Sequence, residues 1–347
     1  MVFSKLAFYK SSTNNVLYEL KPVSVIIAAR NEYKFLEKNL RGVLEQDYPD
    51  FEVIVVNDCS WDDSQKLLEY YQEVYHNLRI CQLIEQEKYP TGKKFAITMG
   101  IKAAQNNQLL FTDADCEPAS NQWLRLMQSK FQNKEIVLGY SPVKKYPGLL
   151  NLFIRYEGAF TAMAYFSAAI QKNAFMGVGR NLAYMRDLFF KHKGFASHQH
   201  ILSGDDDLFI NEAANEHNVS IQLHPDSFVY TEPKKTFEDW QRQKTRHVST
   251  GKYYKPKHQL FLGGYYASLF LFYSCLIVAI LLRADWRLLA SMYAVRFILQ
   301  TTILYFIFTK LKCINLIWFV PILDLLYLFY ITVFGVQSVF VKNKKIW

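Results

Sequence analysis

The 347-residue sequence has few cysteines, and their positions follow no paired spacing. Neither a disulfide framework nor a zinc knuckle is therefore expected, and reduced, cytosol-facing thiols are the simplest interpretation. The N-terminus carries Lys5 and Lys10 but no sustained apolar core, so we expect no signal peptide. The five cysteines are Cys59, Cys81, Cys116, Cys275 and Cys313.

A glycine-rich phosphate loop is also missing. The first predicted strand runs into Ala28-Ala29-Arg30-Asn31-Glu32, whereas a sugar nucleotidyltransferase would need a glycine-rich, arginine-bearing loop there. The segment Gly177-Val178-Gly179 lacks the third glycine and the strand-to-helix context of a dinucleotide-binding fingerprint. The first absence counts against a sugar nucleotidyltransferase, and the second counts against a NAD-dependent enzyme.

Charge nearly vanishes after Phe261, where the chain becomes a series of long apolar stretches. Each stretch meets the requirement of about 20 residues for a membrane-spanning helix. We therefore expect a cytosolic α/β domain over residues 1–260 and a small all-α transmembrane domain of about three helices over residues 261–347. Arg296 and Asp324 lie inside these stretches, and we hypothesise that they pair across two helices. The stretches are roughly Phe261–Leu282, Leu288–Thr309 and Cys313–Val341.

The net charge of +9 is concentrated next to the first apolar stretch. Between Thr231 and Leu260 there are eight Lys or Arg against three Asp or Glu, which favours contact with anionic headgroups. By the positive-inside rule, this predicts an integral protein of the plasma or inner membrane with a cytoplasmic catalytic domain. No nucleic-acid-binding module is recognisable, so nucleic acid is not an expected partner. Segments near 148–170 and 233–258 are expected to be amphipathic and to lie at the membrane interface, with a position under the active site as the alternative for the first.

Strands and helices alternate in the first half of the chain. Apolar, β-branched runs predict strands over Val23–Ala29, Phe51–Val56 and Arg79–Ile84, with a fourth strand ending at Asp115. Helical periodicity follows the first two strands, Ser60 and Asp63 have the spacing of a capping box, and another helix is expected to begin at Pro118. This order predicts a mostly parallel sheet with helices on both faces, in which ligands bind outside the carboxyl ends of the strands.

Several acidic side chains lie at those predicted ends. Asp113 and Asp115 would point the same way if the extended geometry of the strand persists. Two such carboxylates suit Mg²⁺ or Mn²⁺, with phosphate oxygens completing the coordination shell. Further along, Asp205-Asp206-Asp207 precedes a predicted helix. Its acids could simply cap that helix, but three of them exceed what capping needs.

Several motifs occur together and in one order, and together they resemble a family-2 glycosyltransferase. The resemblance covers about residues 20 to 255 and implies a GT-A fold, a nucleotide-sugar donor, membrane anchoring and inversion at the transferred sugar. The motifs are Val25-Ile26-Ile27-Ala28-Ala29-Arg30-Asn31-Glu32, Val55-Val56-Asn57-Asp58-Cys59-Ser60, Gly92-Lys93-Lys94, Thr112-Asp113-Ala114-Asp115, Gly204-Asp205-Asp206-Asp207-Leu208 and Gln243-Lys244-Thr245-Arg246-His247.

On the donor side, the resemblance implies a role for each matching residue. The end of the first strand and Asp58 would receive the nucleobase and ribose, Asp113 would lie near the ribose or diphosphate, and Asp115 would ligate the metal. Lys93 and Lys94 would add positive charge near the phosphates, and Arg246 would contact the diphosphate. The implied donor-binding residues are Ala28, Asn31, Glu32, Asp58, Lys93, Asp113, Gln243 and Arg246, with Asp113 and Asp115 at the metal.

For the reaction itself, alignment on Asp207-Leu208 makes Asp205 the general base, with Gly204 in place of the family's Glu. A slide of one residue would make Asp206 the base instead. Arg180 and Asn181 match a loop near the acceptor. His247 stands where polymerising members have Trp, which counts against processive synthesis.

The predicted function is sugar transfer from a UDP- or GDP-linked donor to a lipid-linked or glycan acceptor. A processive polysaccharide synthase of the same family is the alternative. A sugar nucleotidyltransferase or a non-catalytic membrane scaffold is the alternative from another class. A scaffold would be expected to have lost the acidic residues that this chain keeps.

Overall fold

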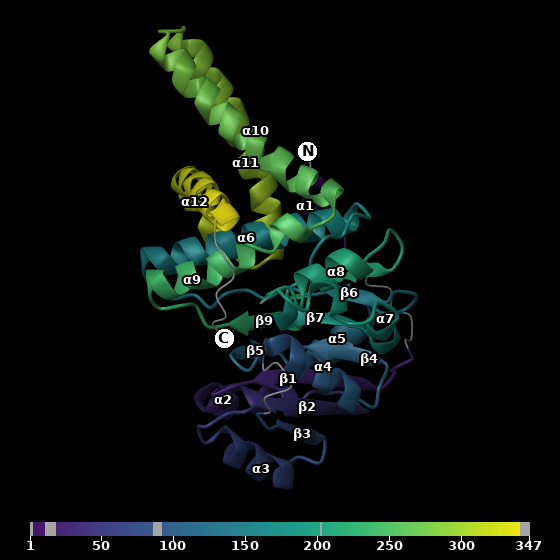
Figure 1. Cartoon of the computed structure of the whole chain (residues 1–347). Coiled ribbons are helices and arrows are strands. Elements are labelled where there is room, and N and C mark those ends of the chain that lie inside the picture. Colours follow the sequence, from purple (N-terminus) through teal and green to yellow (C-terminus); the bar gives the residue numbers. More distant parts are fainter. Residues whose placement is uncertain (1–2, 11–18, 86–91, 202, 341–347) are drawn as a thin grey trace.

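A computed structural model describes the chain apart from residues 1–2, 11–18, 86–91, 202 and 341–347 (Figure 1). Its strands form a seven-stranded sheet and a small two-stranded sheet. The larger sheet comprises β1 (Val23–Ala29), β2 (Phe51–Asp58), β3 (Leu78–Leu83), β4 (Gln108–Phe111), β6 (Ile136–Leu138), β7 (Leu182–Met185) and β8 (Val219–Ile221), and the smaller one β5 (Cys116–Pro118) and β9 (Val229–Thr231).

The strand order of the large sheet is β3-β2-β1-β4-β7-β6-β8. The first four strands are parallel, so that Val25 of β1 lies opposite Val53 of β2 and Leu110 of β4. Only β7 runs antiparallel to both of its neighbours, β4 and β6. The predicted mostly parallel α/β sheet is therefore confirmed, and the carboxyl ends of β1, β2 and β4 meet at one edge.

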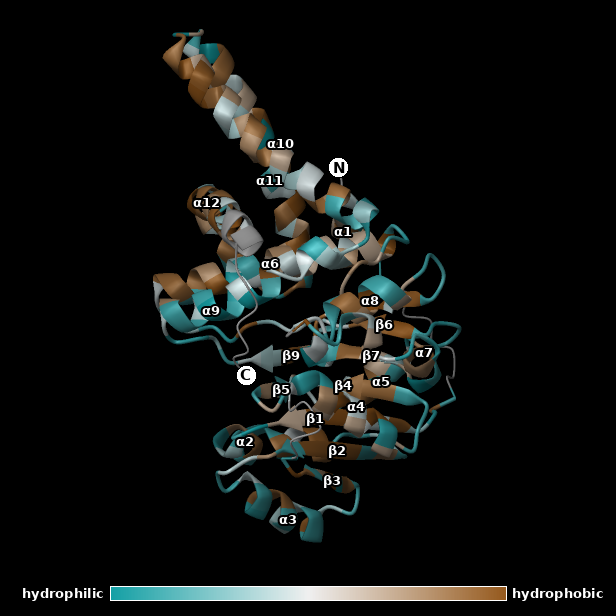
Figure 2. Ribbon diagram, in the orientation of Figure 1, coloured by the Kyte–Doolittle hydropathy of each residue, from teal (hydrophilic) through white to brown (hydrophobic). Residues whose placement is uncertain are grey.

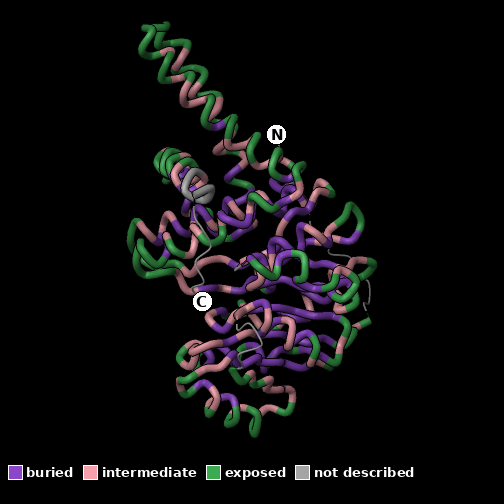
Figure 3. Tube along the Cα trace, in the orientation of Figure 1, coloured by how far each residue is buried: buried purple, intermediate pink, exposed green. Residues whose placement is uncertain are grey.

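Helices cover both faces of this sheet, as Figure 1 shows. The soluble part contains α2 (Tyr33–Leu44), α3 (Ser64–Val74), α4 (Lys93–Ala103), α5 (Trp123–Gln128), α7 (Arg186–Lys191), α8 (Asp207–Ala213) and α9 (Phe237–Val248), with short 3-10 turns η1 (Gly179–Asn181), η2 (Ala196–His198), η3 (Pro225–Ser227) and η4 (Gly251–Tyr253). Because strand side chains alternate, Val25 and Ile27 pack in the cluster with α2, whereas Ile26 packs in the cluster with α4. Figure 3 shows these strands as the buried centre of the domain.

Two local predictions were wrong. Ser60 does not cap α3, because its hydroxyl accepts a hydrogen bond from the Asn31 amide (2.9 Å), and α3 begins later, at Ser64. Pro118 does not begin a helix, because the chain stays extended there and β5 pairs with β9. In both places a contact with a distant segment of the chain overrides the local signal.

The carboxyl-terminal part is helical and apolar. It contains α10 (Pro256–Leu281), α11 (Trp286–Lys310), η5 (Ile314–Phe319) and α12 (Val320–Phe340). Three helical segments are long and apolar enough to cross a membrane: Pro256–Leu281, Trp286–Lys310 and Ile314–Gly335. Figure 1 shows α10 and α11 projecting together from the domain, and Figure 2 shows many hydrophobic residues along both helices. Val341, the predicted end of the last stretch, lies outside the described residues.

The predicted pair between Arg296 and Asp324 is confirmed, with Arg296 Nη2 2.9 Å from Asp324 Oδ2. Asp324 is buried and also accepts hydrogen bonds from Tyr273 (2.8 Å) and Gln300 (2.9 Å). All three apolar segments therefore meet at one satisfied acid, which is how an ionised group is tolerated within such helices.

Helix α6 (Leu149–Ile170) lies between the sheet domain and the apolar helices (Figure 1). The sequence predicts an amphipathic helix here, lying at the membrane or under the active site. Tyr165, Phe166, Ser167 and Ala168 are buried in succession, so this end of α6 is enclosed on every side. The amino-terminal helix α1 (Ser4–Ala7) packs on the same layer, against α6 and α11. We therefore describe α6 as a core helix of the junction between the two parts.

The contact between α4 and the sheet provides a test of this packing. A Cβ atom added at Gly100 would lie 2.7 Å from Ile26 Cγ2 and 2.9 Å from Val56 Cγ2, and both are stiff, β-branched side chains. Gly100→Ala is therefore expected to lower the free energy of unfolding by about 1–3 kcal/mol, measured as a lower thermal midpoint.

Gly158→Ala in α6 is the matched control, because its added Cβ would meet only Val143 Cγ2 at 3.9 Å. This variant should leave the midpoint unchanged or raise it. Equal midpoints for the two variants would contradict the packing of α4 on β1 and β2.

Candidate active site

The loops after β1 and β2 are tied together at the sheet edge. Asn31 and Cys59 both adopt positive φ, at 57° and 55°. The Asn31 amide donates to Ser60 Oγ (2.9 Å), and Asn31 Oδ1 accepts from the Trp61 amide (2.9 Å). The Asn31 side chain is thus used to fix the two loops against each other.

Asp58, the last residue of β2, is completely buried. Neither of its carboxylate oxygens meets hydrogen-bond geometry with a partner among the described residues. Burial raises the pKa of this carboxyl, and Arg30, whose Nη1 lies 3.9 Å from Asp58 Oδ2, works in the opposite direction. The Gly92 backbone and the Cys59 side chain also lower this pKa, and the buried carboxylate suits a ligand that brings further N–H or O–H donors.

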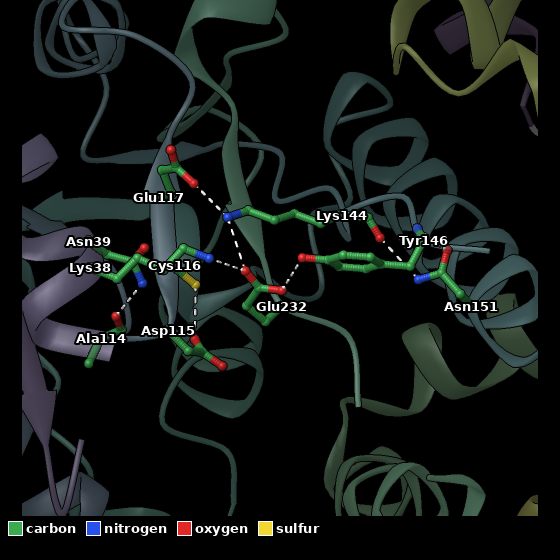
Figure 4. Close-up of polar contacts among 10 residues, drawn as sticks. All are labelled: Lys38, Asn39, Ala114, Asp115, Cys116, Glu117, Lys144, Tyr146, Asn151 and Glu232. Atoms are coloured by element: carbon green, nitrogen blue, oxygen red, sulfur yellow. Dashed lines mark hydrogen bonds and ion pairs between the residues drawn. The ribbon is translucent and has the colours of Figure 1, made fainter. Parts of the chain in front are cut away.

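The acidic segment after β4 is a turn rather than a strand. β4 ends at Phe111, and the Cys116 amide closes the turn onto the Asp113 carbonyl (3.1 Å). The expected strand alternation therefore does not persist, yet ligand atoms of Asp113, Asp115 and Cys116 still lie within 4.8 Å of one another. Asn39 on α2 fixes the turn, since its Nδ2 donates to the Ala114 carbonyl (3.0 Å; Figure 4).

The donor set in this turn fits a hard divalent cation. Burial and the neighbouring carboxylates raise the pKa of the Cys116 thiol well above its usual value, and its Sγ donates to Asp115 Oδ1 (3.2 Å). The protonated thiol is a poor ligand, so the carboxylates of Asp113 and Asp115 remain as the ligand atoms. Burial, followed by the charge of Asp115, raises the pKa of nearby Glu32 to about 7, with Lys234 opposing this shift.

Lys93, the first residue of α4, joins two acidic segments that are far apart in the sequence. Its Nζ lies 2.8 Å from Asp113 Oδ1 and 3.5 Å from Asp205 Oδ2. Burial alone would lower the pKa of this amine, but Asp113 and Asp205 raise it above its usual value, so Lys93 stays charged. Ala28, Asp113, Asp205 and Lys93 all line one pocket.

The three acids before α8 have different surroundings. Asp206 accepts from the Gly179 amide (2.8 Å) and from the Asp207 amide (2.8 Å), so it caps α8. Asp207 accepts hydrogen bonds from Tyr254 (2.7 Å) and Thr250. Asp205 is the acid of the three that faces Lys93 within ion-pair distance.

The backbone conformation explains why position 204 is a glycine, where the family pattern has Glu. Its φ is +96°, and an added Cβ would lie 2.4 Å from Leu208 Cδ1. A side chain at this position would therefore be strained and would collide with α8.

The positive side chains are arranged differently from the prediction. Arg180 lies among the acids, since Cys116, Asp115, Asp113 and Asp206 raise its pKa against the effect of burial. This position favours the diphosphate side of the site over the predicted acceptor side. Burial would raise the pKa of Asp113, but Lys93 lowers it below its usual value. Arg246 on α9 makes a smaller contribution in the same direction.

Two predicted site residues have structural roles instead. Lys94 is buried, and its Nζ donates to the carbonyls of His198 (2.6 Å) and Ile201 (2.8 Å), so it does not reach the phosphate side. Asn181 is completely buried at the centre of the domain. Its Nδ2 donates to the Tyr140 (2.8 Å) and Ser227 (2.9 Å) carbonyls, and its Oδ1 accepts from Trp123 Nε1 (3.0 Å), which leaves no group for an acceptor. Gln243 lies on α9 next to Lys244 and is partly exposed.

The sequence did not reveal an ionic cluster that lies next to the acidic turn (Figure 4). Glu232 lies 2.7 Å from Lys38 Nζ and 3.1 Å from Lys144 Nζ, and Lys144 also pairs with Glu117 (2.5 Å). Partial burial would raise the pKa of Glu232, but Lys38, Lys144 and Tyr146 together lower it to about 2. The cluster links α2, β5 and the end of β9. Asn39 was also missed, although a polar residue on the buried stripe of α2 is a recognisable signal.

Comparison with known proteins shows similarity to one family of enzymes. The family model described as glycosyl transferase family 2 matches residues 24–192. Glycosyltransferase AglE of Haloferax volcanii is 32% identical over 187 residues, which cover 53% of this chain and 58% of that protein. The probable glycosyltransferase YdaM of Bacillus subtilis is 24% identical over 241 residues, covering 68% and 56%. The chain thus spans little more than half the length of these relatives.

Among solved structures, the mannosyltransferase PcManGT from Pyrobaculum calidifontis, determined with GDP-Man and Mn²⁺, has a TM-score of 0.58 at 19% identity. The match covers 89% of this chain and 92% of that one. This likeness supports the GT-A-type α/β fold followed by a helical region.

The buried position of Asn181 gives a test of its role. Asn181→Leu would leave the Trp123 indole N–H and the Ser227 carbonyl without the partners they have in Asn181, each at a cost of about 1–3 kcal/mol. The Tyr140 carbonyl would keep only the Val229 amide. We expect the free energy of unfolding in denaturant to fall by at least about 3 kcal/mol.

Gln243→Leu, a partly exposed amide on α9, is the matched control and should change stability by less than about 0.5 kcal/mol. An Asn181→Leu protein of wild-type stability would contradict the structural role and restore the predicted acceptor role.

Proposed function

Because residues 24–192 match the family model of glycosyl transferase family 2, we propose that this chain is a membrane-anchored, inverting glycosyltransferase. It transfers a sugar from a UDP- or GDP-linked donor to a lipid-linked or glycan acceptor and depends on Mg²⁺ or Mn²⁺. The single observation that carries this proposal is the position of Lys93, whose ammonium bridges Asp113 of the acidic turn and Asp205 of the second acidic motif.

On the donor side, the buried carboxylate of Asp58 is available to donors on the nucleobase or ribose. Lys93, Arg180 and Arg246 place three positive charges around the acidic turn, where a diphosphate would carry its negative charge. Asp113 and Asp115 would hold the cation, which when bound would neutralise the diphosphate and stabilise it as a leaving group. The GDP-Man and Mn²⁺ present in the PcManGT structure agree with this arrangement.

On the acceptor side, Asp205 is the proposed general base. Asp206 is engaged by two backbone amides and Asp207 by two hydroxyl groups, so Asp205 is the acid of the three best placed to receive a proton from an incoming hydroxyl. As the acceptor oxygen attacks C1 from the face opposite the leaving group, its proton passes to Asp205 and the C1–O bond to the diphosphate breaks. The product therefore has the inverted anomeric configuration.

Membrane anchoring follows from the carboxyl-terminal helices. Three segments are long and apolar enough to span a bilayer, and the basic segment 231–260 lies directly before the first of them. By the charge rule, this supports a cytoplasmic catalytic domain that meets its acceptor at the membrane surface.

The base assignment predicts a specific loss of activity. Membranes containing the protein are incubated with a panel of UDP- and GDP-sugars plus Mn²⁺, and nucleoside diphosphate release and sugar transfer are followed. Asp205→Asn should lower the transfer rate by about 10²–10⁴-fold, because it removes the proton acceptor without removing the donor site.

Asp226→Asn, an exposed acid in η3, is the matched control and should leave the rate unchanged. A wild-type transfer rate for Asp205→Asn would refute its role as base, and failure to consume any donor would favour a non-catalytic scaffold.

The metal assignment predicts a requirement for divalent ions. EDTA should abolish transfer, and added Mn²⁺ or Mg²⁺ should restore it. Asp115→Asn removes one of the two hard ligands, so the Mn²⁺ concentration for half-maximal rate should rise at least about tenfold.

Cys116→Ser keeps a donor beside Asp115 and should leave that concentration unchanged. A higher concentration for Cys116→Ser together with an unchanged one for Asp115→Asn would mean that the cysteine, rather than the carboxylate, is the ligand.

A further inference from the structure

The face of α8 away from the active site is polar, buried and bound to the beginning of α10. Asp207 and Asn211, one helical turn apart, are both buried. Asp207 accepts from Thr250 and from Tyr254, in the segment that joins α9 to α10. Asn211 continues the same row of contacts onto α10 itself.

Every hydrogen-bonding atom of the Asn211 side chain has a partner. Its Oδ1 accepts from the Lys255 amide (2.9 Å), and its Nδ2 donates to the Phe175 carbonyl (2.9 Å). The same Nδ2 lies 2.9 Å from Nδ1 of His258, the third residue of α10. Because Phe175 and Lys255 lie on different segments, Asn211 can satisfy all three partners only in one position.

His258 completes the row. It is 1% exposed, and its Nε2 lies 3.1 Å from Asn173 Oδ1. Since Asn211 Nδ2 is a donor, Nδ1 of His258 must accept and Nε2–H must donate to Asn173, which defines one neutral tautomer. A protonated ring would oppose two donors at Nδ1, so the site holds an uncharged histidine.

We propose that this row, Asp207-Asn211-His258-Asn173, positions α8, and with it Asp205, relative to the membrane helix α10. Asn211 and His258 are positioning residues, because they touch neither the pocket around Lys93 nor the acidic turn. Their role rests on the proposed function of Asp205. The row holds Asp205 at a fixed height above the bilayer, where an acceptor anchored in the membrane presents its hydroxyl.

The row should therefore matter for attack by the acceptor and not for binding of the donor. The proposed donor site is built from β1, β2, β4, α4, η1 and α9, none of which carries a residue of the row. Loss of the row should therefore spare nucleotide binding but move the base, and a displacement of about 1 Å can cost about 10²-fold in rate.

The test uses the full chain in membranes of defined composition. His258→Ala should lower the kcat of sugar transfer at least about tenfold and leave the affinity for UDP or GDP, measured with Mn²⁺, unchanged. It should also increase hydrogen–deuterium exchange in residues 207–213. His258→Gln, whose amide can both accept from Asn211 and donate to Asn173, should restore a large part of the rate and protection.

Asn173→Ala removes only the outer partner and serves as a milder second variant. Glu216→Gln, an exposed residue shortly after α8, is the matched control and should change none of these measurements. Effects of Asn211→Ala and His258→Ala should be non-additive, since each breaks the same link.

Unchanged exchange in residues 207–213 for His258→Ala would overturn the link between α10 and α8. Increased exchange with a wild-type transfer rate would overturn its positioning role, as would a loss of nucleotide affinity in step with the rate. If the wild-type protein consumes no donor at all, the proposed function fails, whereas the exchange measurement still decides whether the link exists.

Discussion

The ammonium group of Lys93 is the interaction on which the site depends. Without it, Asp113 and Asp205 would face each other across a partly enclosed pocket, where like charges repel strongly because the effective dielectric constant is low. At 2.8 and 3.5 Å from the two carboxylates, the positive charge of Lys93 offsets that repulsion. The consequence is a site whose anionic half and cationic half are already balanced before a diphosphate and its cation enter. Arg180, placed among Asp113, Asp115 and Asp206, extends the same balance to the acidic turn.

The backbone brings these charges together at small conformational cost. Parallel strands β1, β2 and β4 end at the same edge, which places Asn31, Asp58 and the acidic turn side by side. Positive φ at Asn31 and Cys59 redirects the chain immediately after each strand, and the Asn31 side chain stabilises both turns. Asn39 does the same for the turn at Ala114. The site is therefore held by polar contacts between loops, supported by a sheet whose interior is apolar.

The sequence was sufficient for the features that depend on periodicity and order. The central strands, the helices between them, the apolar helices and the pair Arg296–Asp324 were all predicted, because hydrophobic patterning and the low tolerance for buried charge determine them. The site was predicted as a set of acids at strand ends, and Asp113 and Asp205 do converge on one pocket.

What the sequence could not provide was the direction of individual side chains. Lys93 and Lys94 are adjacent and chemically identical, yet one faces the acids and the other binds two loop carbonyls, because consecutive helix positions point about 100° apart. Asn181 follows Arg180 in the same way but points into the core. Asp205, Asp206 and Asp207 could be separated only once their partners were known, and these come from η1 and the segment after α9, which no local pattern connects.

The junction between the soluble and apolar parts explains why a boundary near residue 260 is a boundary of composition rather than of structure. Glu157 of α6 pairs with Lys244 of α9, Arg155 donates to Asn315 of η5 (2.9 Å), and His258 of α10 binds Asn211 of α8. Each contact satisfies a polar group that would be costly to bury alone, so separating the two parts would leave several such groups unpaired at once. Trp240 of α9 adds apolar contact with Tyr330 and Phe334 of α12. The sheet domain therefore cannot tilt freely on the apolar helices, so the position of these helices becomes part of the geometry of the proposed transfer reaction.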